Sequence, residues 1–123
     1  MSKKIVLLLP FVLASCYNQK RNCKDFKTGS FEFTQEIEGK NETSYFERND
    51  SLQIETFRGQ TDTLAIRWIN DCEYIGKNIR PKNMAEKKSV HIKILTTNEE
   101  GYTFEYSYVG ESKKQRGFVT KKQ

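Results

Sequence analysis

From residue 29 onward, apolar and polar residues alternate along much of the chain, and this period of two is typical of β-strands with one buried face. The clearest apolar runs are Phe31, Phe33 and Ile37; Leu64, Ile66 and Trp68; Val90, Ile92 and Ile94; and Tyr102, Phe104, Tyr106 and Tyr108. Weaker runs at 43–48, 51–57 and 117–120 complete the pattern, together with a strand through Tyr74 that follows a loop near residue 70. It predicts about eight short strands and no helix longer than a turn or two.

Residues that favour tight turns separate these predicted strands. Turns are expected at 38–41, 49–50, 58–62, 98–101 and 110–115. The segment 79–89 interrupts the alternation, and Pro81 precedes either a single helical turn through 84–87 or a plain loop. Sequential strands joined by short turns predict an all-β fold. We expect a single antiparallel meander that closes into a small lipocalin-like barrel or folds into a sandwich.

The register around residue 70 decides which side chains share a face. A two-residue loop at 70–71 would put Tyr74 on the face opposite Trp68, whereas a three-residue loop pairs Trp68 with Cys72 and keeps Tyr74 on the side of Trp68. A slip of one residue moves every following side chain to the other face. We therefore expect the three-residue loop, which buries Cys72.

Aromatic residues are the strongest compositional feature of the predicted inner face. Its expected members are Phe31, Phe33, Tyr45, Trp68, Tyr74, Tyr102, Phe104 and Tyr106. An eight-stranded barrel has an interior that side chains just fill, or that holds one small ligand. One interpretation is therefore a packed core. The other is a barrel mouth that binds an apolar or glycan ligand through Trp68, Tyr74, Tyr102, Phe104 and Tyr106. So many bulky inward side chains leave room for a shallow site at most.

The first sixteen residues have a different character from the rest of the chain. Lys3 and Lys4 precede an apolar run at 5–13, which is too short to span a bilayer. The following Ala14-Ser15-Cys16 resembles the lipobox of a bacterial lipoprotein signal peptide. We expect residues 1–15 to be a signal peptide, 16–28 a lipidated tether that begins at Cys16, and 29–121 the antiparallel β domain.

Lipidation of Cys16 would decide where the protein resides. More than one acyl chain is needed for stable anchoring, and a diacylated or triacylated Cys16 would hold the domain on a membrane. We expect the cell envelope of a bacterium, with the anchor in the outer membrane and the periplasmic or the surface face left open. Removing the two leader lysines leaves 19 basic and 16 acidic residues, a net charge of +3. This modest excess gives no reason to expect nucleic acid as a partner.

Two cysteines remain after Cys16. Because exported proteins occupy compartments in which disulfides persist, we expect Cys23 and Cys72 to form a bridge. The alternative is two free thiols, with Cys72 buried as a small apolar residue. Neither cysteine has an evident base beside it, so a catalytic thiol is not expected.

Other candidate chemistry is sparse. His91 is the only histidine, and the alternation turns it outward with Lys93. One histidine and two cysteines cannot assemble the usual transition-metal ligand sets, so we expect no metal and no cofactor. The carboxylates fall mostly on outward positions or in turns, among them Glu36, Glu38, Glu47, Glu55, Glu73, Glu99 and Glu100. We expect no catalytic residues and no enzyme. The alternative, an enzyme with unrecognised carboxylate chemistry, would require two buried carboxylates that face each other in a cleft.

Two kinds of surface feature add minor hypotheses. Lysines and arginines cluster at 20–21, 87–88 and 113–122, as solvated strand ends or as contacts to anionic headgroups. The sequences at 50–52 and 62–64 resemble the acceptor of O-glycosylation in Bacteroidota envelope proteins, with Ser51 and Thr63 as the modified residues. Both are also ordinary junctions between a turn and a strand.

Three blocks of the chain, 23–31, 48–55 and 67–74, resemble a family of small, uncharacterised Bacteroidota lipoproteins. The resemblance runs through nearly the whole mature chain and brings no established reaction, so it assigns no active-site residues. Relatives sometimes carry a DNA topoisomerase IV label. The short chain, its expected export and the lack of an ATP site argue against that activity.

These observations lead to two functional hypotheses. The first is a lipid-anchored envelope protein whose small β-barrel binds a ligand or a partner protein. The alternative is an inhibitor of a cell-wall hydrolase such as lysozyme, which the mature domain would inhibit at stoichiometric amounts.

Overall fold

A computed structural model describes residues 21–122, and these residues form a closed antiparallel β-barrel. The strands are β1 (Gly29–Ile37), β2 (Lys40–Arg48), β3 (Leu52–Phe57), β4 (Gln60–Asn70), β5 (Glu73–Asn78), β6 (Val90–Thr97), β7 (Gly101–Tyr108) and β8 (Gln115–Lys121). Each strand pairs with the next along the chain, and β8 pairs with β1. The predicted meander is therefore confirmed, and it closes into a barrel and not a sandwich. The expected signal peptide and Cys16 lie outside the described residues.

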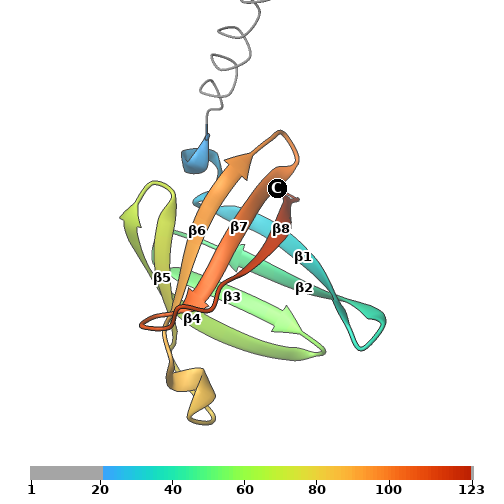
Figure 1. The fold of residues 1–123 in the computed structure, drawn as a ribbon, viewed down its shortest axis with the longest axis vertical. Coiled ribbons are helices and arrows are strands. Elements are labelled where there is room, and N and C mark those ends of the chain that lie inside the picture. Colours follow the sequence, from blue (N-terminus) through green and yellow to red (C-terminus); the bar gives the residue numbers. More distant parts are fainter. Residues whose placement is uncertain (1–20, 123) are drawn as a thin grey trace, which may run out of the picture.

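The two ends of the barrel differ (Figure 1). One end, which we name the closed end, carries the short 3₁₀ helix η1 (Cys23–Phe26) and the turns at 49–51, 71–72 and 98–100. The other, the open end, carries the turns at 38–39 and 58–59 and the longer connections 79–89 and 109–114. Of the two alternatives for residues 84–87, the structure has the helical turn, as the 3₁₀ helix η2 (Ala85–Lys87).

Two turns at the open end fix the register of neighbouring strands. Glu38-Gly39 and Arg58-Gly59 each place two consecutive residues at positive φ, with angles of 52° and 79° and of 51° and 77°. This backbone twist matches that of the flanking strands in a two-residue hairpin. The turns set β1 against β2 and β3 against β4 without a bulge.

The register between β4 and β5 differs from the expected one. Tyr74 does lie on the same face as Trp68, but the two residues pair directly, and Asn70 pairs with Glu73. A bulge between Trp68 and Asn70 absorbs the extra residue, so a two-residue turn takes the place of the predicted three-residue loop. Cys72 is consequently half-buried rather than buried.

The fold begins earlier than the pattern predicts. The pattern assigns segment 23–28 to the tether, yet Cys23 and Phe26 are buried in the core cluster. Cys23 forms a disulfide with Cys72, which joins η1 to the β4–β5 turn and confirms the predicted bridge. A 3₁₀ helix of four residues has no hydrophobic period that a sequence pattern could reveal. The barrel, η1 and the disulfide all lie within residues 21–122, so this part contains its own core.

Candidate functional site

An interior cavity of about 270 Å³ lies within the barrel. Its walls are formed by side chains from every strand of the barrel: Phe33, Gln35, Ser44, Phe46, Gln53, Glu55, Leu64, Tyr74, Val90, Ile92, Tyr102, Phe104, Tyr106 and Val119. Most of these side chains are apolar or aromatic, and several are only half-buried because they face this space. The cavity is close to the lower end of the usual size range of ligand sites, about 300–1,000 Å³.

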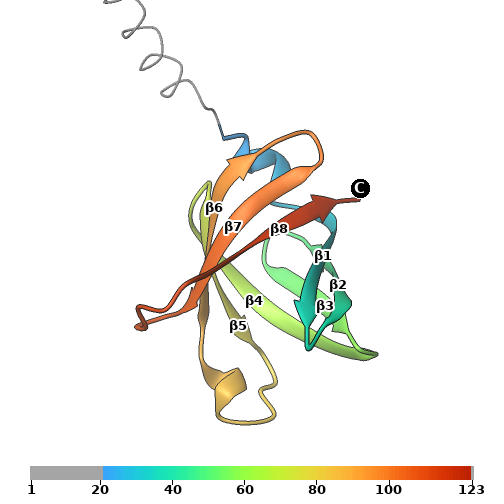
Figure 2. The same ribbon diagram turned by 45° about the vertical axis from the view of Figure 1, so that its right-hand side comes forward.

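A cleft between β1 and β8 meets the cavity from the side. These strands pair only at Phe31–Lys121, Glu32–Thr120 and Phe33–Val119, and beyond Phe33 they separate (Figure 2). The resulting cleft, of about 400 Å³, shares Phe33, Gln35 and Tyr106 with the interior cavity. We name it the seam cleft.

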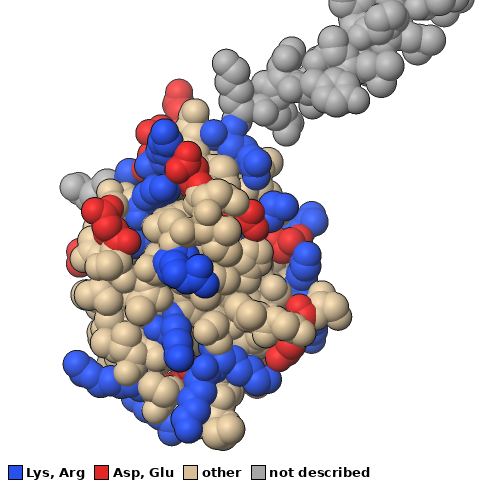
Figure 3. Space-filling view, turned by 90° about the vertical axis from the view of Figure 1, so that its left-hand side faces the viewer, with Lys and Arg blue, Asp and Glu red and all other residues tan. Residues whose placement is uncertain are grey.

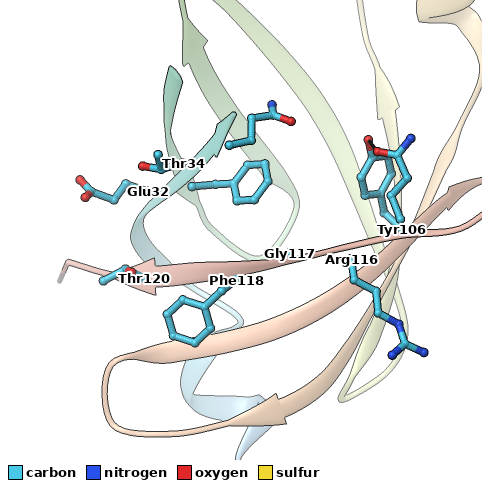
Figure 4. Close-up of a pocket in the computed structure, with 10 residues that line it drawn as sticks. Glu32, Thr34, Tyr106, Arg116, Gly117, Phe118 and Thr120 are labelled. Atoms are coloured by element: carbon cyan, nitrogen blue, oxygen red, sulfur yellow. Dashed lines mark hydrogen bonds between the residues drawn. The ribbon is translucent and has the colours of Figure 1, made fainter. Parts of the chain in front are cut away.

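Gly117 keeps this seam from being filled. A Cβ atom at this position would lie 2.6 Å from Phe33 and 3.0 Å from Phe104. Figure 4 shows Arg116 and Phe118 pointing to one side of β8, with Tyr106 on the other. The inward position between Arg116 and Phe118 is therefore the glycine, and the two phenylalanine rings pack edge to face beside it, with centroids 5.3 Å apart.

Arg48 is the main polar group at the closed end. It is 3% exposed, and its guanidinium lies 4.6 Å from the centroid of the Phe31 ring and 5.0 Å from that of Tyr74. Its Nε donates to the carbonyl of Lys27, Nη1 to Gln53 Oε1 and the Tyr74 hydroxyl, and Nη2 to the carbonyl of Phe26 and the Tyr102 hydroxyl. A guanidinium has five N–H donors, so Arg48 uses all of them within the protein.

Gln53 relays this network to Glu55. Its Oε1 accepts hydrogen bonds from Arg48 at 2.8 Å and from the Tyr74 hydroxyl at 3.1 Å, and its Nε2 donates to Glu55 Oε2 at 2.6 Å. Burial raises the pKa of the Glu55 carboxyl, and nearby Asp62 raises it further, while the bond from Gln53 and the charge of Arg48 oppose that rise. Burial also raises the pKa values of Tyr74 and Tyr102, so both hydroxyls stay protonated at neutral pH.

The position of Glu55 corrects an expectation. The alternation predicts an outward carboxylate, but Glu55 pairs with Asp62 across β3 and β4, and both positions face the interior. Only Glu55 lines the cavity. Asp62 is 36% exposed at its side chain and lies 3.9 Å from Lys82. The pair thus does not form two buried carboxylates that face each other across a cleft.

Four of the five expected ligand-binding residues line the cavity, and the fifth, Trp68, does not. Tyr74, Tyr102, Phe104 and Tyr106 line the cavity. Trp68 does not line it, because it packs against Tyr74 at the closed end with ring centroids 4.8 Å apart. Tyr45, expected on the same inner face, is 55% exposed on the outer face, and Phe46 occupies the inward position instead.

His91 faces outward, as expected. Its Nε2 lies 2.9 Å from Glu73 Oε1, and Asn70 donates to the other oxygen of Glu73. These contacts, first that from Asn70 and then that from His91, lower the pKa of Glu73. The group lies on the outer surface, away from the cavity, and ties the β4–β5 turn to β6.

The described part of the chain contains neither a candidate metal site nor a helix that could span a membrane. Within residues 21–122, no cluster of three or more histidine, cysteine or acidic residues could hold a metal ion. The same residues include no helix long and apolar enough to cross a membrane. Ser51 is exposed at the β2–β3 turn and Thr63 is half-buried on β4, and their glycosylation stays a prediction.

Comparison of the chain with family models, with curated proteins and with solved structures found no match. The resemblance to Bacteroidota lipoproteins therefore stays a prediction.

Proposed function

We propose that this chain is a lipid-anchored protein of the bacterial envelope whose barrel binds a small, largely apolar molecule. The observation that carries the proposal is the interior cavity. A space of about 270 Å³, walled by apolar and aromatic side chains and joined to the seam cleft, is the kind of site in which proteins hold small ligands.

The contrast between the two ends supports binding from one side. η1, the disulfide and Arg48 cover the closed end, so a ligand would enter through the open end or the seam cleft. Arg21 is held at the closed end by its bond to the carbonyl of Ile94, 3.0 Å long. It follows Cys16 by five positions, at most about 17 Å of extended chain. A lipid on Cys16 would then keep the closed end toward the membrane and the cavity accessible.

Binding is tested with a neutral fluorescent probe, N-phenyl-1-naphthylamine, and a soluble form of the chain that begins at residue 17. We expect saturable fluorescence enhancement with one probe per chain. Ser44→Phe places a ring inside the cavity and should weaken binding by about tenfold or more, as expected for loss of a buried ligand contact of at least about 1.4 kcal/mol. Thr43→Phe, on the outer face of the same strand, is the matched control and should bind normally.

The outcomes separate clearly. Absence of saturable binding, or equal binding by the Ser44→Phe and Thr43→Phe variants, would contradict the proposal. Circular dichroism confirms that each variant is folded, and Val90→Phe replaces Ser44→Phe if the latter does not fold.

Lipidation is tested separately, by intact mass of the full chain from the membrane fraction of a bacterial host. We expect a mature chain that starts at an acylated Cys16, and Cys16→Ser should abolish the lipid. A mature chain without lipid would show that the anchor is wrong, even if the barrel binds the probe.

A further inference from the structure

The cavity wall contains one strong acceptor with spare hydrogen-bonding capacity. Glu55 Oε2 accepts a bond from Gln53, but no side chain among residues 21–122 donates to Oε1, and no lysine or arginine of that segment forms an ion pair with Glu55. A carboxylate accepts about four hydrogen bonds. Glu55 lines the cavity and is half-buried, and its Oε1 is not among the fully buried atoms that lack a partner, so this oxygen is accessible.

No lysine, arginine or histidine is among the described residues that line the cavity, so a bound anion would meet only neutral donors, such as the Gln35 amide and the Ser44 hydroxyl. All five N–H groups of Arg48 are used by carbonyl, amide and hydroxyl acceptors, and Arg48 does not line the cavity. The Gln53 carbonyl oxygen is also occupied, because it already accepts two bonds. Among the described residues that line the cavity, Glu55 is the only charged one, and Asp62 adds negative charge from the neighbouring strand.

Aromatic side chains surround the space in front of this carboxylate. Phe46 stands opposite Glu55 in the β2–β3 register, and Tyr74, Tyr102, Phe104 and Tyr106 complete the wall. The faces of aromatic rings attract cations, most strongly where water is excluded. The barrel already uses this attraction for Arg48, which lies within 6.0 Å of five ring centroids.

We propose that the ligand is an organic amine, a small apolar or aromatic body with one protonated nitrogen, and that Glu55 binds this nitrogen. The inference rests on the proposed function, because it names the class of molecule that the cavity holds. The volume of about 270 Å³ limits the body to one or two rings or a short aliphatic chain.

The open end of the barrel carries mainly positive charge, opposite in sign to Glu55 in the cavity. The connections 79–89 and 109–114, together with the start of β8, contain Arg80, Lys82, Lys87, Lys88, Lys113, Lys114 and Arg116, against Glu86 and Glu111. Figure 3 shows lysine and arginine side chains gathered at the lower part of this side of the molecule. Such positive charge would draw anions toward the mouth. The positive charge outside the cavity thus favours an anion, whereas Glu55 inside it favours a cation. The binding test therefore includes an anionic compound.

The experiment compares three indoles that differ mainly in their polar end: tryptamine, a cation; tryptophol, a neutral alcohol; and indole-3-propionate, an anion. Each displaces N-phenyl-1-naphthylamine from the soluble form of the chain. We expect tryptamine to bind about tenfold or more tightly than tryptophol, the ratio that one charged hydrogen bond contributes, and indole-3-propionate to bind most weakly. In Glu55→Gln, tryptamine and tryptophol should bind equally well.

A matched control and the pH dependence sharpen the assignment. Glu47→Gln makes the same change on the outer face of the neighbouring strand and should leave the preference intact. Lowering the pH to about 4, near the ordinary pKa of a glutamate, should reduce the preference in the wild type but not in Glu55→Gln. The charged and titratable groups near Glu55 are Asp62 on β4, Arg48 on β2, Tyr74 on β5 and Tyr102 on β7, and of these only Asp62 is also a carboxyl group. Asp62→Asn isolates its share.

The possible failures are distinct. If N-phenyl-1-naphthylamine binds but the three indoles bind equally, or the anion binds best, the amine inference is wrong while the proposed function stands. The amine inference is likewise wrong if no indole displaces the probe, or if Glu55→Gln keeps the preference for tryptamine. If the probe itself does not bind, both proposals are wrong.

Discussion

The two ends of this barrel differ in how fully their inward polar groups are hydrogen-bonded. At the closed end Arg48 is buried among aromatic rings, and each of its donors meets an acceptor. Nearer the open end Glu55 faces a cavity with one carboxyl oxygen that receives no bond from residues 21–122. Buried polar groups are nearly always hydrogen-bonded within a fold, whereas an accessible carboxylate oxygen without a partner can accept a bond from a ligand. The same inner face thus contributes stability at one end and, by our proposal, binding at the other.

Gln53 connects these two regions. Its amide oxygen accepts a bond from Arg48, and its amide nitrogen donates one to Glu55. Removing groups at the closed end should therefore cost mainly stability, and removing Glu55 should cost mainly ligand preference. Three variants test whether stability and ligand preference are separated in this way.

The largest effect is expected for Arg48→Ala. The change removes the donor to two carbonyls and two hydroxyls and one of the two donors to the Gln53 oxygen. Loss of a buried network of this kind puts the expected destabilisation at about 5 kcal/mol, the upper end for one substitution. Urea unfolding measures it. Arg67→Ala, at an exposed position on β4, is the control and should change stability by no more than about 0.5 kcal/mol. Equal effects of the two changes would mean that Arg48 does not hold the closed end together.

The second effect concerns the covalent link of η1 to the barrel. Cys23 and Cys72 are 49 positions apart, and closing a loop of this length in the unfolded chain contributes about 4 kcal/mol in the chain-entropy model. The double variant Cys23→Ala, Cys72→Ala should lose about this much in urea unfolding. It should still bind N-phenyl-1-naphthylamine where it is folded, because neither cysteine lines the cavity. Loss of binding by a folded double variant would show that the two ends are not separable.

Much of this arrangement could be predicted from the sequence. The strand positions and the meander follow from the period-two pattern and the turn residues, and the disulfide follows from the expectation that the chain is exported. The pattern misplaces Tyr45 because two aromatic residues are adjacent in 40–48, so hydrophobicity does not define the inward face. The turn does define it: a two-residue turn at 38–39 pairs Phe31 with Phe46, which turns Tyr45 outward.

The pairing set by a two-residue turn would also have predicted that Glu55 faces inward. In β3 the pattern is inverted, because Ile54 is 41% exposed while Gln53 and Glu55 face inward. A two-residue turn at 58–59 pairs Leu64 with Gln53 and Asp62 with Glu55, so an inward Leu64 implies an inward glutamate. Alternation alone fails here because it assumes that polar residues face water. The cavity volume could not be predicted at all, since it depends on how β1 and β8 separate beyond Phe33.

The smallest effect is expected for the stability of Glu55→Gln, and it depends on pH. Burial raises the pKa of Glu55 in the folded state, so its contribution to stability is fully present below the unfolded pKa and is lost as the pH rises through the folded value. The glutamine side chain of the variant cannot ionise and avoids that loss. The variant should therefore unfold at a higher temperature than the wild type at about pH 7, and the difference should shrink toward pH 4, near the ordinary pKa of a glutamate. Thermal unfolding followed by circular dichroism at both pH values measures it.

Glu47→Gln, on the outer face, should show no such trend. A Glu55→Gln variant that is less stable than the wild type at neutral pH would mean that the carboxylate serves the network of Arg48, and the division between the two ends would then be wrong.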